Sequence, residues 1–259
     1  MIHPLASVSS GAAVDPSAEI GPWALVEAGS EVGAGCVIAA HAVIRRGARL
    51  AAKVRVDHFA VIGGDPQDLA FDTSTSSFTV IGEGTVVREH VTVHRATKPG
   101  GSTIVGAGCL LMAGSHVAHD CALGEKVILA NGCMLGGHVT VGASAFVSGG
   151  AAVHQFCRIG EGCMVSGNAV ITEDVPPQVI AHGRNDVSGL NLVGLRRRGA
   201  GPETTAELKR AYHAVYGPGT DCPELAARAL AEGGYRAPEA VRFLEFFLSG
   251  KRGRYASPR

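Results

Sequence analysis

The stretch from His116 to Asp120 combines residues that can move a proton. It contains two histidines, His116 and His119, and Asp120 directly follows the second of them. A neutral imidazole is an effective general base near pH 7, where it typically contributes a factor of about 10²–10⁴ to a reaction rate. A carboxylate beside the ring can orient and polarise it. The pattern therefore indicates that His119 abstracts a proton from a substrate.

Two other interpretations of these histidines stay open at this point. Histidines on the turns of a regular fold can simply be solvated polar residues. A zinc site is the second alternative, but His-x-x-His with only distant partners is weak evidence for a metal. We expect no metal.

A six-residue repeat determines where these side chains lie. Every sixth residue from Ile2 to Ile62 is aliphatic, and the same spacing resumes at Ile81, one residue out of phase. We call these aliphatic residues the beat positions. A period of six suits a short strand plus a tight turn, and three such units make a triangular coil of about 18 residues whose strands stack about 4.8 Å apart. The longest unbroken run comprises Val105, Leu111, Val117, Leu123, Leu129, Leu135, Val141, Val147, Val153, Ile159, Val165 and Ile171.

Residues 18 apart should lie one above another in such a stack. This spacing brings a set of polar residues and glycines to one outer corner, namely His119, Asp120, Gly137, His138, His154 and Gln155. The backbone N–H of Gly137 could stabilise an oxyanion that develops beside His119. Because no serine or cysteine nucleophile is obviously placed there, direct transfer is favoured over a covalent intermediate.

The repeat ends near Asp174, and the pattern changes to helical beyond about residue 186. We expect a β-solenoid over 1–185, with projecting loops at 63–79 and 95–103, and a helical domain over 186–259. Within that domain the spacing predicts helices over 188–199 and 204–216. Two more helices should begin near Asp221 and Pro238, each with a proline early in its first turn.

Composition excludes several classes of function. Lysine plus arginine and aspartate plus glutamate both number 23, so no net charge points to nucleic acid. No apolar stretch is long enough to span a membrane, and no signal peptide is evident, so a cytoplasmic protein is expected. Six of the seven cysteines lie two residues before an aliphatic beat position, which favours buried small hydrophobic residues over disulfides.

Several strings together resemble the UDP-N-acetylglucosamine O-acyltransferase family of lipid A biosynthesis, within the hexapeptide-repeat acyltransferases. The resemblance covers nearly the whole chain, including Pro66–Leu69, Thr92–Arg95, His116–Cys121, Ile128–Asn131, Gly137–Val139, Val153–Cys157, Asp174–Pro177 and Gly194–Gly199. It implies a left-handed parallel β-helix with a C-terminal α-helical domain. It also implies a homotrimer with active sites between neighbouring prisms.

The resemblance also implies roles for individual residues. His119 would take a proton from the sugar 3-hydroxyl, Asp120 would orient it, and Gly137 would stabilise the oxyanion. The residues implied in contacts with the sugar nucleotide or the acyl donor are Asp68, His94, His116, His138, His154, Gln155, Gly167, Asn191, Arg197 and Arg198. The donor would be an (R)-3-hydroxyacyl thioester on the phosphopantetheine of acyl carrier protein, so no resident cofactor is expected.

Two departures from the family pattern keep alternatives open. Ala70 stands where the family usually has lysine, and Val193 where it usually has an acid. Both positions bear on the sugar nucleotide, so the acceptor could be the 3-amino analogue and the product an amide. A non-catalytic solenoid that binds carrier protein or nucleotide is the remaining alternative. A basic C-terminal surface suits the acidic carrier protein, and it comprises Arg196, Arg197, Arg198, Lys209, Arg210, Lys251, Arg252, Arg254 and Arg259.

Overall fold

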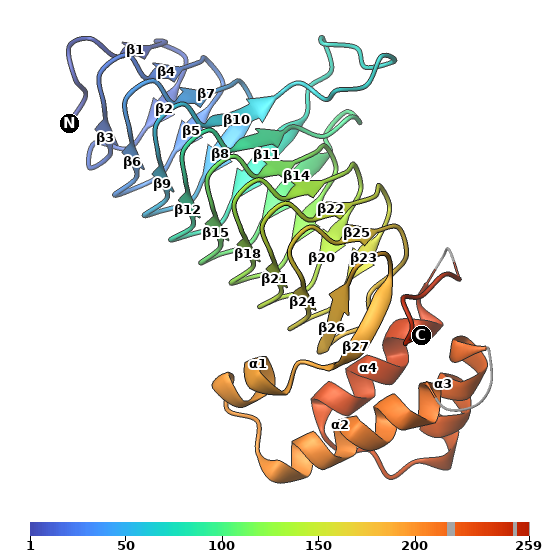
Figure 1. The fold of residues 1–259 in the computed structure, drawn as a ribbon. Helices are drawn as coiled ribbons and strands as arrows, with labels where there is room; N and C mark the ends of the chain where they lie inside the picture. Colours follow the sequence, from blue (N-terminus) through green and yellow to red (C-terminus); the bar gives the residue numbers. More distant parts are fainter. Residues whose placement is uncertain (217–220, 251–252, 259) are drawn as a thin grey trace.

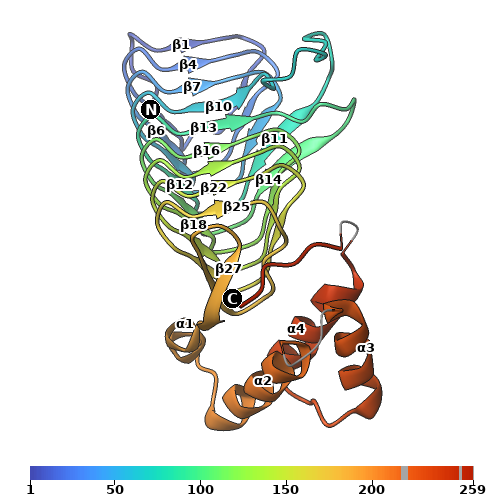
Figure 2. The same ribbon diagram turned by 45° about the vertical axis from the view of Figure 1, so that its right-hand side comes forward.

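The six-residue repeat folds into a left-handed parallel β-helix with three flat sides (Figures 1 and 2). The computed structural model describes residues 1–216, 221–250 and 253–258. Most strands contain two residues and pair in parallel with the strand that comes three later in the chain. The fold class predicted from the sequence is confirmed.

Each side of the prism is one sheet. The first comprises β1 (Ser7–Val8), β4 (Leu25–Val26), β7 (Val43–Ile44), β10 (Val61–Gly64), β13 (Thr92–His94), β16 (His116–Val117), β19 (Met134–Leu135), β22 (Ala152–Val153) and β25 (Val170–Ile171). The second comprises β2 (Ala13–Val14), β5 (Glu31–Val32), β8 (Ala48–Leu50), β11 (Phe78–Ile81), β14 (Ser102–Val105), β17 (Ala122–Leu123), β20 (Thr140–Val141) and β23 (Arg158–Ile159). The third comprises β3 (Glu19–Ile20), β6 (Val37–Ile38), β9 (Arg55–Val56), β12 (Val86–Val87), β15 (Leu110–Leu111), β18 (Ile128–Leu129), β21 (Phe146–Val147), β24 (Met164–Val165), β26 (Val179–His182) and β27 (Asp186–Leu190).

The strand register agrees with the stacking predicted from the repeat. His116 pairs with Met134, and Met134 pairs with Ala152, so residues 18 apart are neighbours in the sheet. In each two-residue strand the second side chain points inward and the first points outward. The beat residues are therefore the inward ones.

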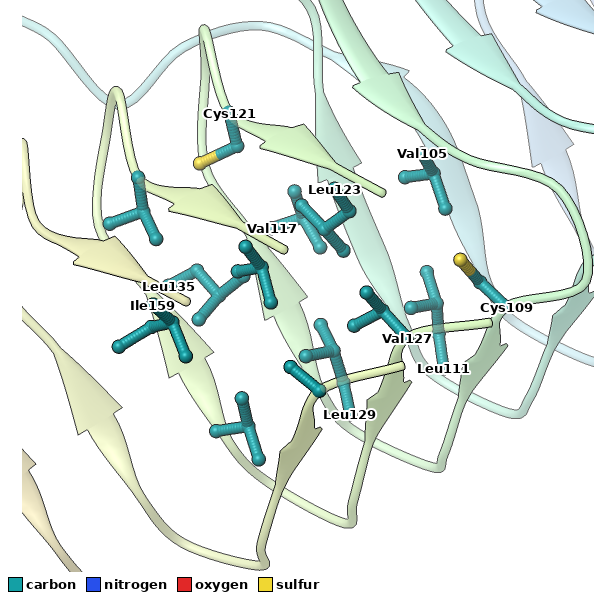
Figure 3. Packing of buried hydrophobic residues seen from close by; sticks show 14 of the residues in the cluster. Val105, Cys109, Leu111, Val117, Cys121, Leu123, Val127, Leu129, Leu135 and Ile159 are labelled. Atoms are coloured by element: carbon teal, nitrogen blue, oxygen red, sulfur yellow. The ribbon is translucent and has the colours of Figure 1, made fainter. Parts of the chain in front are cut away.

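The core is a narrow column of aliphatic side chains inside the coils (Figure 3). Val117, Leu129 and Leu135 are fully buried there. The six cysteines that precede beat positions are also buried, as predicted: Cys36, Cys109, Cys121, Cys133, Cys157 and Cys163. Each thus acts as a small apolar residue near a turn.

Two loops project from the prism near β11 (Figures 1 and 2). Loop 1, residues 65–77, connects β10 to β11, and loop 2, residues 95–101, connects β13 to β14. Both lie close to the expected ranges, although the outer residues of those ranges belong to the flanking strands.

The chain becomes helical later than the sequence pattern predicts. Residues 186–190 form β27, which pairs antiparallel with β26 and buries Val187. The helix expected over 188–199 is shorter: α1 spans Leu192–Arg197, because the side chain of Asn191 caps it by accepting from the N–H of Gly194. The strand pairing overrides the helical spacing at its start.

Three further helices pack together beyond the last coil (Figure 2). They are α2 (Pro202–Val215), α3 (Cys222–Glu232) and α4 (Pro238–Leu248), as the spacing and the early prolines predict. Their shared core includes Leu208, Phe243 and Phe247. Within the described residues, no helix has the length and apolar character needed to cross a membrane.

Candidate active site

His119 and Asp120 lie together on the corner of the prism between β16 and β17. Nδ1 of His119 is 2.8 Å from Oδ2 of Asp120, and both side chains are largely buried. Because Nδ1 faces the carboxylate, it carries the proton of the neutral ring, and Nε2 is left to accept another. The pair has the geometry of an oriented general base.

Loop 2 holds the carboxylate of Asp120. Oδ2 accepts hydrogen bonds from the hydroxyl of Thr97 at 2.7 Å and from its backbone N–H at 3.1 Å, while the N–H of Asp120 donates to Oγ1 of Thr103 at 2.8 Å. Burial alone would raise the pKa of Asp120, but the hydrogen bonds from Thr97 and His119 outweigh it and lower the pKa from its ordinary value. Asp120 is therefore ionised at neutral pH. The repeat pattern alone does not identify either threonine as a contact of Asp120.

Gly137 lies against the imidazole of His119, one coil further along. A Cβ at this position would stand 2.5 Å from Cε1 and 2.7 Å from Nε2 of His119, so no larger residue fits without a shift. Within the described residues the N–H of Gly137 has no acceptor, whereas the neighbouring N–H groups of Gly136 and His138 donate to carbonyls. An unpaired amide beside Nε2 is suited to bind an oxyanion.

A groove of about 520 Å³ runs beside His119 along the outer face of the first sheet. Met134, Ala152 and Val170, the outward residues of successive strands, give it an apolar floor. Its lining comprises Gln67, His94, His116, Ala118, His119, Met134, Leu135, Gly136, Gly137, Ala152, Val153, His154, Gln155, Val170, Ile171 and Thr172. The combination of imidazoles and an apolar strip suits a ligand with a polar head and a hydrocarbon chain.

Two further imidazoles form one end of the groove. The rings of His94 and His116 meet edge to face with centroids 4.6 Å apart, and Nδ1 of His116 is 2.7 Å from Oγ1 of Thr92. Burial, with the neighbouring His116 and His119, lowers the pKa of His94 to about 4, and burial also lowers the pKa of His116. Both rings are thus neutral at pH 7 and can accept or donate hydrogen bonds.

His138 also lies beside the His119–Asp120 pair, which we call the dyad. Its ring is stacked on Phe156 with centroids 4.6 Å apart and meets His119 edge to face. Nε2 of His138 is 3.8 Å from Oδ2 of Asp120, so ligand atoms of His119, Asp120 and His138 are close enough to share a cation. Oδ2 of Asp120 already accepts from Thr97 and faces Nδ1 of His119, however, which suits proton transfer more directly.

Six of the ten substrate contacts implied by the resemblance lie outside the lining of the groove, and His138, beside Asp120, is one of them. Asp68 is exposed on loop 1, where it accepts from the N–H of Ala70, and Gly167 is exposed on a later coil. The amide of Asn191 caps α1 and donates to the carbonyl of Gly162. Arg197 and Arg198 are exposed at the end of α1. Gln67, next to Asp68 in the string quoted for the resemblance, is the loop 1 residue that reaches the groove.

The fold and this corner together define an acyltransferase of the hexapeptide-repeat class. Residues 174–255 match the second domain of UDP-N-acetylglucosamine O-acyltransferase, and residues 102–137 match the bacterial transferase hexapeptide (six repeats). The chain belongs to the UDP-N-acetylglucosamine O-acyltransferase family.

Solved structures support this assignment over the whole length. The UDP-N-acetylglucosamine acyltransferase of Francisella novicida is 31% identical, with a TM-score of 0.93 over 100% of this chain and 95% of that one. The enzyme of Campylobacter jejuni is 32% identical, with a TM-score of 0.93 over 100% of both chains. The Arabidopsis enzyme is 28% identical, with a TM-score of 0.86 over 100% of both.

Proposed function

We propose that this enzyme transfers an (R)-3-hydroxyacyl chain from acyl carrier protein to the 3-hydroxyl of UDP-N-acetylglucosamine, the first step of lipid A biosynthesis. The observation that carries the proposal is the His119–Asp120 pair, 2.8 Å apart, at a groove with an apolar floor. We expect the enzyme to work in the cytoplasm.

The reaction is a direct displacement at a thioester. Nε2 of His119 takes the proton of the sugar hydroxyl as its oxygen attacks the carbonyl carbon, and Asp120 stabilises the imidazolium that forms. The N–H of Gly137 donates to the oxyanion of the tetrahedral intermediate. The intermediate collapses by breaking the carbon–sulfur bond, and the departing thiolate of phosphopantetheine takes the proton from His119.

The remaining groove residues bind and orient the substrates. His94, His116 and Gln67 offer polar contacts at one end, His154 and Gln155 offer them along the rim, and the apolar floor takes the acyl chain. His138, Asp68, Gly167, Asn191, Arg197 and Arg198 remain proposed contacts. Because both the oxygen and the nitrogen of the Asn191 side-chain amide already form hydrogen bonds, we expect this residue to shape the site by holding α1 in place.

Two partners complete the proposal. A homotrimer would close the open side of the groove with a neighbouring prism, and the basic C-terminal surface would attract the acidic carrier protein. Arg196, Arg197 and Arg210 of that surface are exposed. Lys251, Arg252 and Arg259 lie outside the described residues.

Acyl transfer to two acceptors tests the function. Purified enzyme with 3-hydroxyacyl carrier protein is offered UDP-N-acetylglucosamine and, separately, its 3-amino analogue, and the product is identified by mass. We expect the ester. Amide formation alone would assign the acceptor to the 3-amino sugar, which Ala70 and Val193 leave open. Silence with both acceptors would favour a non-catalytic binding protein.

The mechanism is tested with His119→Ala, matched by His213→Ala on an exposed face of α2. We expect the first variant to lose about 10²–10⁴-fold in kcat while its unfolding curve stays close to that of the parent, since general-base catalysis contributes this much. The second variant should keep full activity. An active His119→Ala enzyme would overturn the assignment of the base.

A further inference from the structure

A buried guanidinium stands at the start of loop 2, directly after His94. Arg95 is only 4% exposed. Its Nε donates to Oδ1 of Asp65 at 2.8 Å, one terminal nitrogen donates to the carbonyl of Thr73 at 2.8 Å, and the other donates to the carbonyl of Thr75. The guanidinium also lies over the ring of Phe71, 4.9 Å from its centroid. All of these partners belong to loop 1.

The backbone around Arg95 closes the base of the same loop. The N–H of Arg95 donates to the carbonyl of Gly64 at 2.9 Å, and the N–H of Ala96 donates to the carbonyl of Phe78 at 3.3 Å. The hydroxyl of Ser77 donates to the carbonyl of Ala96 at 2.6 Å. Residues 95–96 therefore bind both ends of loop 1 as well as its middle.

Loop 1 receives fewer hydrogen bonds from other parts of the chain: Arg46 donates to the carbonyl of Thr73 at 3.3 Å, and the N–H of Gly100 donates to the carbonyl of Ser76 at 2.8 Å. Within the loop the described bonds are short-range turns, such as those from Phe71 N–H to the carbonyl of Asp68 and from Thr75 N–H to the carbonyl of Asp72. The loop nevertheless brings Gln67 to the groove, beside His94 and His116. A loop that lacks regular structure but presents a residue to a site needs a fixed anchor.

We propose that Arg95 is a positioning residue, which anchors loop 1 so that Gln67 forms one wall of the groove. The proposal rests on the proposed acyl transfer, and it adds a residue that touches neither substrate. Arginine suits the task because its planar fork binds a carboxylate and two carbonyl oxygens at once, whereas lysine offers a single compact charge.

Two measurements on Arg95→Met and Arg95→Lys test the anchor. Hydrogen exchange reports on loop 1 without any turnover, and the amides of Phe71 and Thr75 should exchange at least about tenfold faster in Arg95→Met because their loop opens more often. In acyl transfer, KM for at least one substrate should rise about tenfold, while the pH profile of kcat keeps its shape because His119 and Asp120 are untouched. Arg95→Lys should fall between the parent and Arg95→Met.

The matched control is Lys53→Met, which removes another cation from an exposed ion pair with Glu83 on a different corner. It should leave both exchange and KM unchanged. Asp65→Asn, which weakens the anchor from the loop side, should move both quantities in the same direction as Arg95→Met but less far. This variant keeps the proposal testable if Arg95→Met does not fold.

A double-mutant cycle with Gln67→Ala decides whether Arg95 acts through Gln67. If it does, Arg95→Met should raise KM much less in the Gln67→Ala background than in the parent, because the wall is already lost. Additive effects, or unchanged exchange of loop 1 in Arg95→Met and Asp65→Asn, would overturn the inference. A parent enzyme that transfers no acyl group would instead refute the proposed function, while the exchange result would still judge the anchor.

Discussion

At the scale of single residues, Gly137 is a position in the site with no space for a side chain. An added Cβ would meet the ring of His119 at 2.5 Å, so Gly137→Ala must displace the imidazole. We expect kcat to fall about 10²-fold, since a misplacement of about 1 Å in a catalytic group costs that much. Steady-state kinetics and a thermal unfolding curve measured together separate this effect from unfolding.

Gly201→Ala provides the matched control, because an added Cβ there has nothing within 4 Å. Its kcat should equal that of the parent. If Gly137→Ala were as active as Gly201→Ala, the ring of His119 would have room that the structure denies it, and its position against Gly137 would not matter for catalysis.

His94 should make stability depend on pH. Its pKa falls from 6.5 to about 4 through burial and the nearby His116 and His119, so between these values the unfolded chain binds more protons than the folded one. The titration of His94 therefore costs no stability above pH 6.5. As the pH falls from 6.5 towards 4, the free energy of unfolding decreases by up to about 1.4 kcal/mol per pH unit.

Urea unfolding between pH 4 and 7, at constant protein concentration, measures this slope. His94→Leu removes the titrating ring and should flatten the slope, whereas His213→Leu on the exposed face of α2 should not. Equal slopes for the parent and His94→Leu would mean that His94 is not the residue responsible.

At the scale of elements, loop 2 connects the dyad to the rest of the site through Thr97. Thr97→Val removes the hydroxyl that donates to Asp120 at 2.7 Å and leaves the backbone donor at 3.1 Å. The pKa of Asp120 should rise, because this hydrogen bond is the largest influence that lowers it. With a less firmly held carboxylate, kcat should fall about tenfold, which corresponds to the lower range for a hydrogen bond to a charged group.

The pH profile of kcat checks this prediction. Its acid limb should move to higher pH in Thr97→Val, in the direction of the raised pKa of Asp120. Thr205→Val, which removes a hydroxyl bonded to the carbonyl of Gly201 on α2, is the control and should leave kcat and the profile unchanged. A profile for Thr97→Val that matches the control would show that loop 2 does not tune the dyad.

The repeat predicts some elements well and others poorly, for a physical reason. Within the stack, geometry follows from spacing, so the closeness of His119 and Gly137 could be predicted from the 18 residues between them. The contact between Thr97 and Asp120 could not, since loop 2 interrupts the period. Asn191 was predicted as a substrate contact, but its short amide was equally suited to cap a helix, and only the structure shows it doing so.

At the scale of the whole molecule, the three sides of the prism differ in polarity. Near its C-terminal end the second sheet borders α4, where Arg158 donates to the carbonyl of Phe246 and its guanidinium lies 4.0 Å from the centre of that ring. The third sheet presents a continuous apolar row of outward residues, namely Val86, Leu110, Ile128, Phe146, Met164 and Ile180. The first sheet carries the groove. The corner between the third and the first sheets has Gly114, Gly132 and Gly150, which leave room for the close approach of a neighbouring chain.

This arrangement predicts which faces meet in the proposed trimer. Around a threefold axis at the glycine corner, the third sheet of one chain would cover the groove on the first sheet of the next. Ile128→Lys places a charge in the middle of the apolar row and should give single chains of 26.5 kDa by light scattering, where the parent gives about three times that mass. Thr140→Lys, on the second sheet, should remain trimeric. Since the groove would then lie open, the Ile128→Lys chain should also lose acyl transfer, whereas an active single chain would show that one prism is sufficient for catalysis.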